Sequence, residues 1–423
     1  MLELSHKKVL VIGLGVSGRA AAEFLLHHGA NVTGVDRNAD LLKTNSDLAA
    51  LRKMGLVTRH ENDLLDCSSF DFTVVSPGVP TTQKQVQTVV AAHIPVFGEI
   101  ELACRFLKNR CVGITGTNGK TTVTLLVTHV LNENGIKARA VGNVGTPLTA
   151  ELLHEHDLKE VYVLELSSYQ LETLESQFLD AAVILNITPD HLDRYVDMND
   201  YAQAKIRIGK CLKENGKLYV ENKCYQEYRN LFDNQRPFIY GYEEKTDHNK
   251  ENNEAACALC QTLGVLKEDF ERALQSFKKP PHRIEYVATI NGVDFIDDSK
   301  GTNIDAVIRA VESCDKKCVL IAGGVDKGSA YTPWIAAFAG KVKGICAIGQ
   351  AADKIKKELS PHLPVELFPS LDSAVKHAAS LAGPGEVVML SPGCSSFDMF
   401  DDYVHRGNEF KKSVKSLSQG EVS

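Results

Sequence analysis

A glycine-rich stretch near the start of the chain has the spacing of a nucleotide-binding loop. Residues 13–18 read GLGVSG, follow a short apolar run at 9–12 and precede a helical pattern. Asp36 ends the next apolar run, about 20 residues further on, as in dinucleotide-binding motifs. Glycines at this spacing let the backbone approach a pyrophosphate, which the N-terminus of the helix stabilises. The motif predicts a nucleotide pyrophosphate site without specifying a nicotinamide, and a tight turn without a ligand is the alternative.

A second loop, residues 115–122 with the sequence TGTNGKTT, resembles a Walker A loop. In such loops backbone amides and a lysine hold phosphates, and a Thr hydroxyl binds Mg²⁺. The general pattern has Gly where this chain has Ile114, but strand, loop, Gly-Lys-Thr-Thr and helix occur in order. The loop predicts a triphosphate site. A GTPase is disfavoured, because Tyr225 stands where the Asp of the guanine motif Asn-Lys-x-Asp belongs.

Three polar residues of the middle region are candidates for metal chemistry. Glu165 lies near the end of the apolar run 161–166, where a Walker-type metal carboxylate is expected, although a capping or loop acid would also fit. His191 follows another strand end in the sequence NITPDHLD, and a structural histidine is equally consistent with that position. Lys205 falls on a predicted helix, where a lysine is normally a solvated charge.

Three polar motifs follow three apolar runs in the last third of the chain. They are residues 298–303 (DSKGTN), 323–327 (GGVDK) and 391–397 (SPGCSSF). Open α/β sheets bind ligands at the carboxyl ends of their strands, where all three motifs are predicted to lie. Each motif alone is also consistent with a polar turn, but three in one region favour a ligand site.

The elements that must position these residues alternate between short apolar strands and helices, which predicts an α/β fold of parallel sheets covered by helices. An Asn-Gly pair at 291–292 predicts a hairpin between residues 284–290 and 293–296. Further strands are expected at 9–12, 31–36, 72–75, 111–115, 161–166, 181–185, 318–321, 345–348 and 387–390. Helices are expected at 17–28, 82–92, 121–134, 201–212 and 253–263.

The length of the chain agrees with three such domains. It has 423 residues, and at about 150 residues per domain this suggests about three. Two prolines at 280 and 281 follow a predicted helix and indicate a linker. We expect a Rossmann-like domain at 1–98, a P-loop ATPase-type domain at 99–280 and a second Rossmann-like domain at 281–423.

Composition excludes several classes of protein. The net charge of −7 argues against a protein that coats nucleic acid or anionic membrane. Hydrophobic residues at 43% and charged residues at 24% disfavour disorder, collagen and coiled coil. No apolar run has the length of a membrane span or of the core of a signal peptide, so a cytoplasmic location is expected. Eleven scattered cysteines favour buried thiols over disulfides, and the pairs 257/260 and 314/318 lack nearby partner motifs for zinc.

Taken together, the motifs resemble those of the Mur ligase family over nearly the whole chain. Family members share the loop at 116–121 (GTNGKT), which accounts for Ile114. Residues 164–171 (LELSSYQL), 298–303 and 390–398 (LSPGCSSFD) are similar to the member that adds D-glutamate. Other members typically carry Asp-Tyr-x-His where this chain has Asp-Ser-Lys at 298–300.

The resemblance implies ATP-dependent addition of D-glutamate to UDP-N-acetylmuramoyl-L-alanine, in cytoplasmic synthesis of peptidoglycan precursors. ATP would phosphorylate the terminal carboxylate of the substrate, the amine of D-glutamate would attack the acyl phosphate, and phosphate would leave. The resemblance also implies two Mg²⁺ sites and a monomeric enzyme whose partners are small molecules, neither nucleic acid nor membrane.

Roles for individual residues follow from the resemblance as well. It implies that ATP contacts Gly116, Thr117, Asn118, Gly119, Lys120, Thr121, Thr122, Asn252, Arg283 and Asp298. One Mg²⁺ would bind Thr121 and Glu165, and the other would bind His191 and Lys205, with the lysine carbamylated. Carbamylation turns a cation into an anion and needs a transiently neutral lysine.

The substrates are implied to bind at the two ends of the chain. The uridine nucleotide would contact Val16, Ser17, Asp36 and Gly78, and D-glutamate would contact Thr302, Lys327, Ser396, Phe397 and Tyr403. Asn143 would lie near the acyl-phosphate centre, and Lys120, His191, Lys205 and Lys300 would join it as catalytic residues.

Two alternatives stay open from sequence. The first is another ATP-dependent ligase of an acid and an amino acid, such as the L-alanine-adding Mur enzyme or a polyglutamate synthetase. The second, from a different class, is a nicotinamide oxidoreductase built on residues 13–18.

Overall fold

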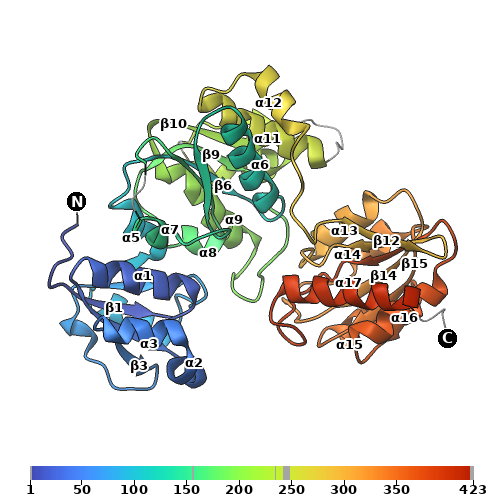
Figure 1. Ribbon diagram of the computed structural model, residues 1–423, viewed down its shortest axis with the longest axis horizontal. Helices are drawn as coiled ribbons and strands as arrows, with labels where there is room; N and C mark the ends of the chain where they lie inside the picture. Colours follow the sequence, from blue (N-terminus) through green and yellow to red (C-terminus); the bar gives the residue numbers. More distant parts are fainter. Residues whose placement is uncertain (1, 155–156, 234, 242–247, 420–423) are drawn as a thin grey trace. The chain divides into compact units, whose positions relative to one another are not determined.

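The computed structural model describes residues 2–154, 157–233, 235–241 and 248–419, which form three sheets in succession along the chain (Figure 1). The first sheet contains β1 (Lys8–Ile12), β2 (Asn31–Asp36), β3 (Val57–His60), β4 (Phe72–Val75) and β5 (Val96–Gly98). The second contains β6 (Arg110–Thr115), β7 (Ala138–Gly142), β8 (Val161–Glu165), β9 (Leu179–Ile184), β10 (Leu212–Glu221) and β11 (Phe238–Tyr240). The third contains β12 (Glu285–Ile290), β13 (Val293–Asp297), β14 (Cys318–Gly323), β15 (Val342–Ile348), β16 (Val365–Leu367) and β17 (Val387–Leu390).

Helices connect most of these strands. With the first sheet are α1 (Val16–His27), α2 (Ala39–Thr44), α3 (Ser46–Lys53), α4 (Lys84–Ala91) and the 3₁₀ turn η1 (Cys67–Ser69), and α5 (Glu99–Cys104) leads to the second sheet. With the second are α6 (Lys120–Glu133), α7 (Leu148–Glu151), α8 (Ser168–Leu171), α9 (Met198–Ile206), η2 (Arg207–Cys211), α10 (Asn222–Tyr228), η3 (Arg229–Leu231), α11 (His248–Thr262) and α12 (Lys267–Leu274). With the third are α13 (Ile304–Glu312), α14 (Pro333–Phe338), α15 (Ala352–Leu359), α16 (Leu371–Leu381) and α17 (Tyr403–Gln419).

The strand orders bring the predicted motifs to the centre of each sheet. The orders are β3-β2-β1-β4-β5, β11-β10-β9-β6-β8-β7 and β12-β13-β17-β14-β15-β16. All neighbours pair in parallel except β12 and β13. The connections therefore change direction beside β1, β6 and β17, and crevices for ligands form at the carboxyl ends of such central strands.

The apolar core explains why the central strands read as continuous hydrophobic runs. In β14 of the third sheet, Leu320 packs with helices α13 to α15, whereas Val319 and Ile321 pack with α16 and α17. Alternate side chains point to opposite faces of a strand, so a strand covered on both faces is apolar at every position. The predicted α/β class with parallel sheets is confirmed.

The chain forms two compact units. The first comprises Met1–Ile187 and Asn199–Phe277 and holds the first two sheets; the second comprises Thr188–Met198 and Lys278–Ser423 and holds the third. In the first unit the apolar core of the first sheet includes Leu102 of α5, and Leu152 packs against it. Residues of α5 and of the segment after α7 thus pack on the core of the first sheet, and the segment Thr188–Met198 belongs with the third sheet. The division into domains at 98 and 280 remains a proposal.

Most predicted elements occur within a few residues of their expected bounds. The hairpin is confirmed, with Asn291 and Gly292 both at positive φ as its tight turn requires. The helix expected at 201–212 was placed too far along the chain, because α9 ends at Ile206, a 3₁₀ turn follows and Leu212 already pairs with β9. No helix among the described residues is long and apolar enough to cross a membrane.

Candidate functional site

A cavity of about 800 Å³ opens at the carboxyl ends of β1 and β4 in the first unit. One wall comes from the first sheet and includes Gly13, Gly15 and the segment 76–80, and the other comes from the second sheet. All four residues predicted for the uridine nucleotide line this cavity, and so does one residue predicted for the acyl-phosphate centre; they are Val16, Ser17, Asp36, Gly78 and Asn143.

The glycine-rich loop is held in place by the side chain of Asp36 at the end of β2. The Asp36 carboxylate accepts hydrogen bonds from the backbone N–H groups of Leu14 at 2.6 Å and Asn38 at 2.8 Å. Gly13 has a φ of +85°, and a Cβ there would lie 2.7 Å from Val79. A Cβ on Gly15 would meet no atom within 4 Å. Gly13 is therefore needed for the turn, whereas Gly15 leaves room for a ligand.

Several cavity residues were not found from the sequence. Arg37, Glu61 and Gln83 line the wall of the first sheet, and Gln170 lines the opposite wall. Arg37 adjoins Asp36 and could have been included on that ground. Gln170 lies within the motif 164–171, but no ligand role was assigned to it, and its capping box with Ser167 at the start of α8 explains its residue type without a ligand.

The phosphate loop lies at the carboxyl end of β6. Gly116 has a φ of +152° and Gly119 a φ of +87°, which favour glycine at both positions. The Asn186 side chain accepts from the backbone N–H of Asn118 at 2.8 Å and donates to its carbonyl at 3.0 Å. Asn186 follows β9, the neighbour of β6, and sequence reasoning missed it. Strand, loop and helix thus present the amides at the start of α6 as in an anion site.

Two lysines converge on the carbonyl of Gly116. Lys120 Nζ donates to the carbonyls of Gly116 and Thr117 at 2.8 Å each, and Lys205 Nζ donates to Gly116 at 2.8 Å. Lys205 is only 2% exposed and lies over the ring of Tyr201, 4.6 Å from its centroid. The Tyr201 hydroxyl lies 3.2 Å from the Thr117 hydroxyl. Lys205 is therefore a buried loop contact and not the solvated charge typical of helical lysines.

Glu165 lies at the end of β8, beside the phosphate loop strand. Asn143 Nδ2 donates to Glu165 Oε1 at 2.7 Å, and the Asn143 backbone N–H donates to the Glu165 carbonyl at 2.9 Å. Glu165 Oε2 is buried and has no hydrogen-bond partner among the described residues. Burying a carboxylate oxygen that accepts no hydrogen bond costs free energy unless a cation binds to it. The hydroxyl of Thr121, in the first turn of α6, is the other ligand type predicted here, and both residues are buried.

Asn252 also reaches the phosphate loop. It lies on α11, and its Oδ1 is 2.6 Å from the position that a Cβ on Gly119 would take. Thr122 is half-buried in the first turn of α6. Every residue up to Asn252 that the sequence predicted to contact ATP or the uridine nucleotide therefore lies in the first unit.

The second unit presents a different set of charged groups. Asp298, which follows β13, is 6% exposed; it accepts from Ser391 Oγ at 2.6 Å and from the Ile284 backbone N–H at 3.3 Å. Burial raises the pKa of the Asp298 carboxyl to about 7, against hydrogen bonds and the Arg283 charge that lower it. Lys300 Nζ lies 3.9 Å from the centroid of the Tyr403 ring. These predicted residues thus share one edge of the third sheet.

A buried arginine supports this edge. Arg406, in the first turn of α17, is 1% exposed and donates to the carbonyls of Ser299 at 2.8 Å and Cys394 at 3.2 Å. Burial lowers the pKa of its guanidinium to about 10. Ser299 Oγ in turn donates to the Tyr403 carbonyl at 2.8 Å. Arg406 therefore connects two predicted motifs, and only contacts in three dimensions reveal it.

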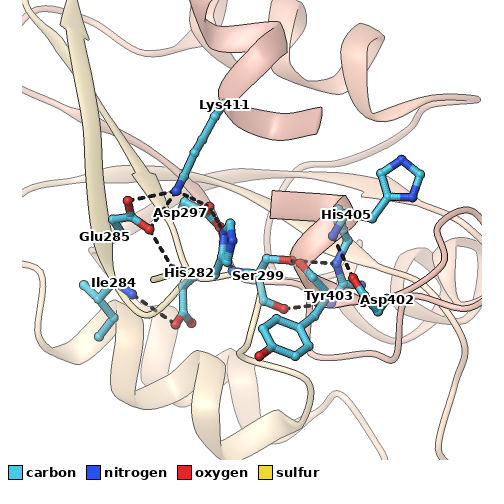
Figure 2. Close-up of polar contacts among 11 residues, drawn as sticks. His282, Ile284, Glu285, Asp297, Ser299, Asp402, Tyr403, His405 and Lys411 are labelled. Atoms are coloured by element: carbon cyan, nitrogen blue, oxygen red, sulfur yellow. Dashed lines mark hydrogen bonds and ion pairs between the residues drawn. The ribbon is translucent and has the colours of Figure 1, made fainter. Parts of the chain in front are cut away.

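A second network, which includes Asp297 next to Asp298, is drawn in Figure 2. His282 Nδ1 lies 2.6 Å from Asp297 Oδ2, and the His282 backbone N–H donates to Glu285 Oε2 at 2.7 Å. Lys411 Nζ contacts both oxygens of Glu285 at 2.8 Å and lies 3.8 Å from Asp297. The His-Glu-Asp group has the donor types of a metal site. Because the Lys411 ammonium already lies close to both carboxylates, where it would repel a metal cation, the group is better explained as a structural support.

His191 belongs to the second unit, in the segment that follows β9. Its φ is +57°, and the neighbouring Asp190 is 6% exposed. Asp190 Oδ1 accepts from Lys327 Nζ at 3.0 Å, and Oδ2 accepts from Asn303 Nδ2 at 3.2 Å. Lys327, predicted to hold a carboxylate of the incoming amino acid, thus contacts a carboxylate of the chain itself. Of the remaining residues predicted for that ligand, Thr302 is half-buried, Ser396 is buried and Phe397 is 73% exposed.

Three family models match the chain in order. A "Mur ligase MurD-like, N-terminal domain" matches residues 7–98, a "Mur ligase middle domain" matches 114–269, and a "Mur ligase, glutamate ligase domain" matches 282–394.

Curated relatives match over almost their whole length. A UDP-N-acetylmuramoylalanine–D-glutamate ligase of Protochlamydia amoebophila is 51% identical, covering 97% of this chain and 98% of the relative. A ligase of the same name from Acidobacterium capsulatum is 39% identical, covering 98% and 97%.

Solved structures with low sequence identity share the fold. UDP-N-acetylmuramate-alanine ligase MurC from Thermotoga maritima gives a TM-score of 0.60 at 17% identity, covering 97% of this chain and all of that one. MurF ligase from Thermotoga maritima, solved in complex with ADP, gives 0.59 at 16% identity, covering 98% and 96%. The family models and the relatives together show that the chain belongs to the Mur ligase family.

Proposed function

We propose that this protein is an ATP-dependent ligase that adds D-glutamate to UDP-N-acetylmuramoyl-L-alanine in the synthesis of peptidoglycan precursors. The observation that carries the proposal is the shared cavity, in which the nucleotide loop of the first sheet faces Asn143 of the phosphate-loop sheet. Asn143 contacts Glu165, so a substrate in this cavity extends from a nucleotide site toward a phosphate site. The choice of D-glutamate rests on the relatives that carry this activity in their names.

The proposed reaction makes a poor electrophile reactive. The terminal carboxylate oxygen of the substrate attacks the γ-phosphorus of ATP, which forms an acyl phosphate and releases ADP. The amine of D-glutamate then attacks the acyl carbon, loses a proton, and phosphate leaves with the electrons of the broken C–O bond. The contribution of the protein is positioning together with neutralisation of phosphate charge.

The residues of the phosphate loop are assigned to ATP. The amides between Gly116 and Thr122 and the Lys120 ammonium hold its phosphates, and Asn252 is assigned to the adenine. Lys120 now donates to two loop carbonyls at 2.8 Å, which keeps its ammonium next to the loop where a phosphate would bind. From the second unit, Arg283, Asp298 and Lys300 contact the nucleotide and the transferred phosphate.

Thr121 and Glu165 fit a Mg²⁺ ion. Glu165 Oε2 is buried without a partner among the described residues, and oxygen ligands from a carboxylate and a hydroxyl suit this ion. Bound Mg²⁺ would neutralise charge on the phosphate oxygens. His191 and Lys205 are assigned to a second ion, with Lys205 carbamylated. Burial of Lys205 supports this assignment, because a desolvated lysine is more easily neutral and a neutral amine is what reacts with CO₂.

D-glutamate is assigned to the second unit. Lys327 supplies a point charge for a carboxylate, and its present contact with Asp190 is a carboxylate contact of the same kind. Thr302, Ser396, Phe397 and Tyr403 complete the proposed site. We also propose that the enzyme acts as a cytoplasmic monomer on small molecules.

A coupled assay of ADP release tests the proposal. ADP should form only when UDP-N-acetylmuramoyl-L-alanine and D-glutamate are both present, and L-glutamate or L-alanine should not replace D-glutamate. ADP release that does not depend on D-glutamate would overturn the specific assignment and favour a ligase with a different amine. A spectral change on addition of a nicotinamide cofactor, without ADP release, would favour the oxidoreductase alternative.

A further inference from the structure

Two buried glutamates lie on the short helix that leads from the first sheet to the second. Glu99 and Glu101 of α5 are 2% and 1% exposed. Burying a carboxylate costs free energy unless hydrogen bonds or ion pairs replace its water. The hydrogen bonds of Glu99 and Glu101 therefore indicate which parts of the structure these buried carboxylates support.

Glu99 contacts the segment that follows the Asn143 loop. Its Oε1 accepts from both the backbone N–H of Thr149 at 2.6 Å and the Thr149 hydroxyl at 2.7 Å. Burial raises the pKa of the Glu99 carboxyl. Thr149 lies in α7, directly after the residues of 142–147 that line the cavity. Glu99 thus fixes the far end of that cavity segment.

Glu101 contacts the segment that follows Gln170. Its Oε2 accepts from the backbone N–H groups of Glu175 and Ser176, both at 2.9 Å, and its Oε1 accepts from the Ser176 hydroxyl at 2.8 Å. Arg105 Nη2 lies 2.9 Å from Oε1 and neutralises the charge. The preceding Gly98 packs so closely on Thr173 that a Cβ would overlap its hydroxyl.

Gly98, the residue before α5, is fixed to the opposite wall of the cavity. Gly98 is the last residue of β5 and pairs with Val75 of β4. Residues 76–80, which follow Val75, line the cavity from the first sheet. One short stretch of chain, residues 98–101, therefore contacts the supports of both walls.

We propose that Glu99 and Glu101 are positioning residues that set the spacing between the two walls of the substrate cavity. The inference rests on the proposed function, because that function places UDP-N-acetylmuramoyl-L-alanine in this cavity. Neither glutamate touches the substrate; each acts through the segments that carry Asn143 and Gln170.

The test replaces Glu99 by residues that keep or lose its acceptor. A single oxygen, Oε1, accepts both bonds from Thr149, so the carbonyl of Glu99→Gln can replace it, whereas Glu99→Leu leaves two buried donors without a partner. We expect Glu99→Leu to raise both the KM and the Kd for UDP-N-acetylmuramoyl-L-alanine at least about tenfold, because even one unsatisfied buried donor has an effect of that size. Glu99→Gln should stay within about twofold of the unchanged protein, because its acceptor is retained.

Two further measurements separate positioning from general damage. In Glu99→Leu the KM for ATP should change by less than about twofold, because the phosphate loop is supported by β6 and β9 and not by Glu99. Glu133→Leu is the matched control, because Glu133 is an exposed glutamate of the same unit. Thr149→Val removes one of the two donors and provides the test if Glu99→Leu does not fold, as judged by circular dichroism.

Titration calorimetry with UDP-N-acetylmuramoyl-L-alanine in the absence of ATP gives the Kd without turnover. If the unchanged protein binds this nucleotide and the folded variants Glu99→Leu and Thr149→Val bind it equally well, the inference is wrong while the proposed function stands. If the unchanged protein does not bind it, the proposed function fails first. A parallel rise in the KM for ATP would show general damage and also overturn the positioning role.

Discussion

Lys205 is the residue whose proposed role departs furthest from its ordinary chemistry. Its ammonium donates to the Gly116 carbonyl from a site that is 2% exposed. Lys205→Ala should lower the rate of ADP release at least about a hundredfold, because a catalytic group held in a phosphate site typically contributes that much. Added bicarbonate should not restore the rate.

Lys205→Arg distinguishes a carbamate from a simple cation. Arginine keeps the positive charge but does not form a lysine-type carbamate, so this variant should be as inactive as Lys205→Ala. Lys210→Ala, at an exposed lysine a few residues away, should keep its activity. Activity of Lys205→Arg close to that of the unchanged enzyme would rule out the carbamate.

Asp298 predicts a pH dependence of stability. Its folded-state pKa of about 7 lies above the ordinary value of 3.8, so folding favours the protonated carboxyl. The resulting contribution to stability is fully present below about pH 4 and is lost as the pH rises through 7. Relative to Asp298→Asn, whose side chain does not titrate, the unchanged protein should lose about 2 to 3 kcal/mol of unfolding free energy between pH 5 and pH 8.

Urea unfolding of both proteins at the two pH values measures this difference. Ser391 donates to Asp298 Oδ2 and would still find a carbonyl or amide group in the Asn variant. Parallel pH profiles for the two proteins would show that Asp298 does not titrate in this range.

Among the elements, the β1–loop–α1 unit separates what glycine does for folding from what it does for binding. A Cβ on Gly18 would overlap the Gly13 carbonyl oxygen, a backbone atom that cannot move without unwinding the turn. Gly18→Ala should therefore destabilise the protein by about 2 kcal/mol or more, as overpacking does. Its thermal unfolding midpoint should fall.

Gly15→Ala should have the opposite pattern. A Cβ at Gly15 meets no protein atom within 4 Å, and the φ of this residue is −63°, which any residue adopts. The added methyl group points into space that the proposed pyrophosphate needs, so the Kd for UDP-N-acetylmuramoyl-L-alanine should rise about tenfold with an unchanged unfolding midpoint. Unaltered binding in Gly15→Ala would place the nucleotide elsewhere.

The same elements show how far sequence reasoning reaches. Strands such as β6 and β14 were predicted because they are buried on both faces and therefore consist mainly of apolar residues. β10 was missed because its first half, from Leu212, is polar and exposed. The end of α9 was misplaced because it is set by the pairing between β9 and β10, which no local pattern in the sequence shows.

The candidate site divides in a similar way. Loops that bind through consecutive residues, such as 13–18 and 116–121, have a local signature and were predicted. Asn186, Arg406 and Glu99 act through partners fifty or more residues away in the sequence. Their residue types are common in loops and helices, so no local pattern distinguishes them.

On the scale of the whole molecule, the charges are placed at a few points and do not form a broad basic surface. The net charge is −7, although ATP, the uridine nucleotide and glutamate are all anions. Lys120 and Lys205 meet at one loop carbonyl, and Lys300 lies against Tyr403 in the other unit. Affinity for anions should thus come from these positioned cations and from metal ions more than from long-range attraction.

The assignment of ATP to residues of both units predicts that turnover depends on both units, whereas binding of the nucleotide depends on the first. Lys120 belongs to the first unit, whereas Arg283 and Lys300 belong to the second, and all three are assigned to one nucleotide. Contacts to the reacting phosphate position it for transfer, whereas the phosphate loop alone can hold the nucleotide. A double variant, Arg283→Ala with Lys300→Ala, should therefore still bind a non-hydrolysable ATP analogue in titration calorimetry, while its rate of ADP release falls at least about a hundredfold.

The double variant keeps the phosphate loop of the first unit, so its binding of the ATP analogue is the control for correct folding. What it loses is the set of contacts that the second unit is proposed to make to the nucleotide and the transferred phosphate. A rate of ADP release close to that of the unchanged enzyme, with the analogue still bound, would mean that Arg283 and Lys300 do not carry the assigned role.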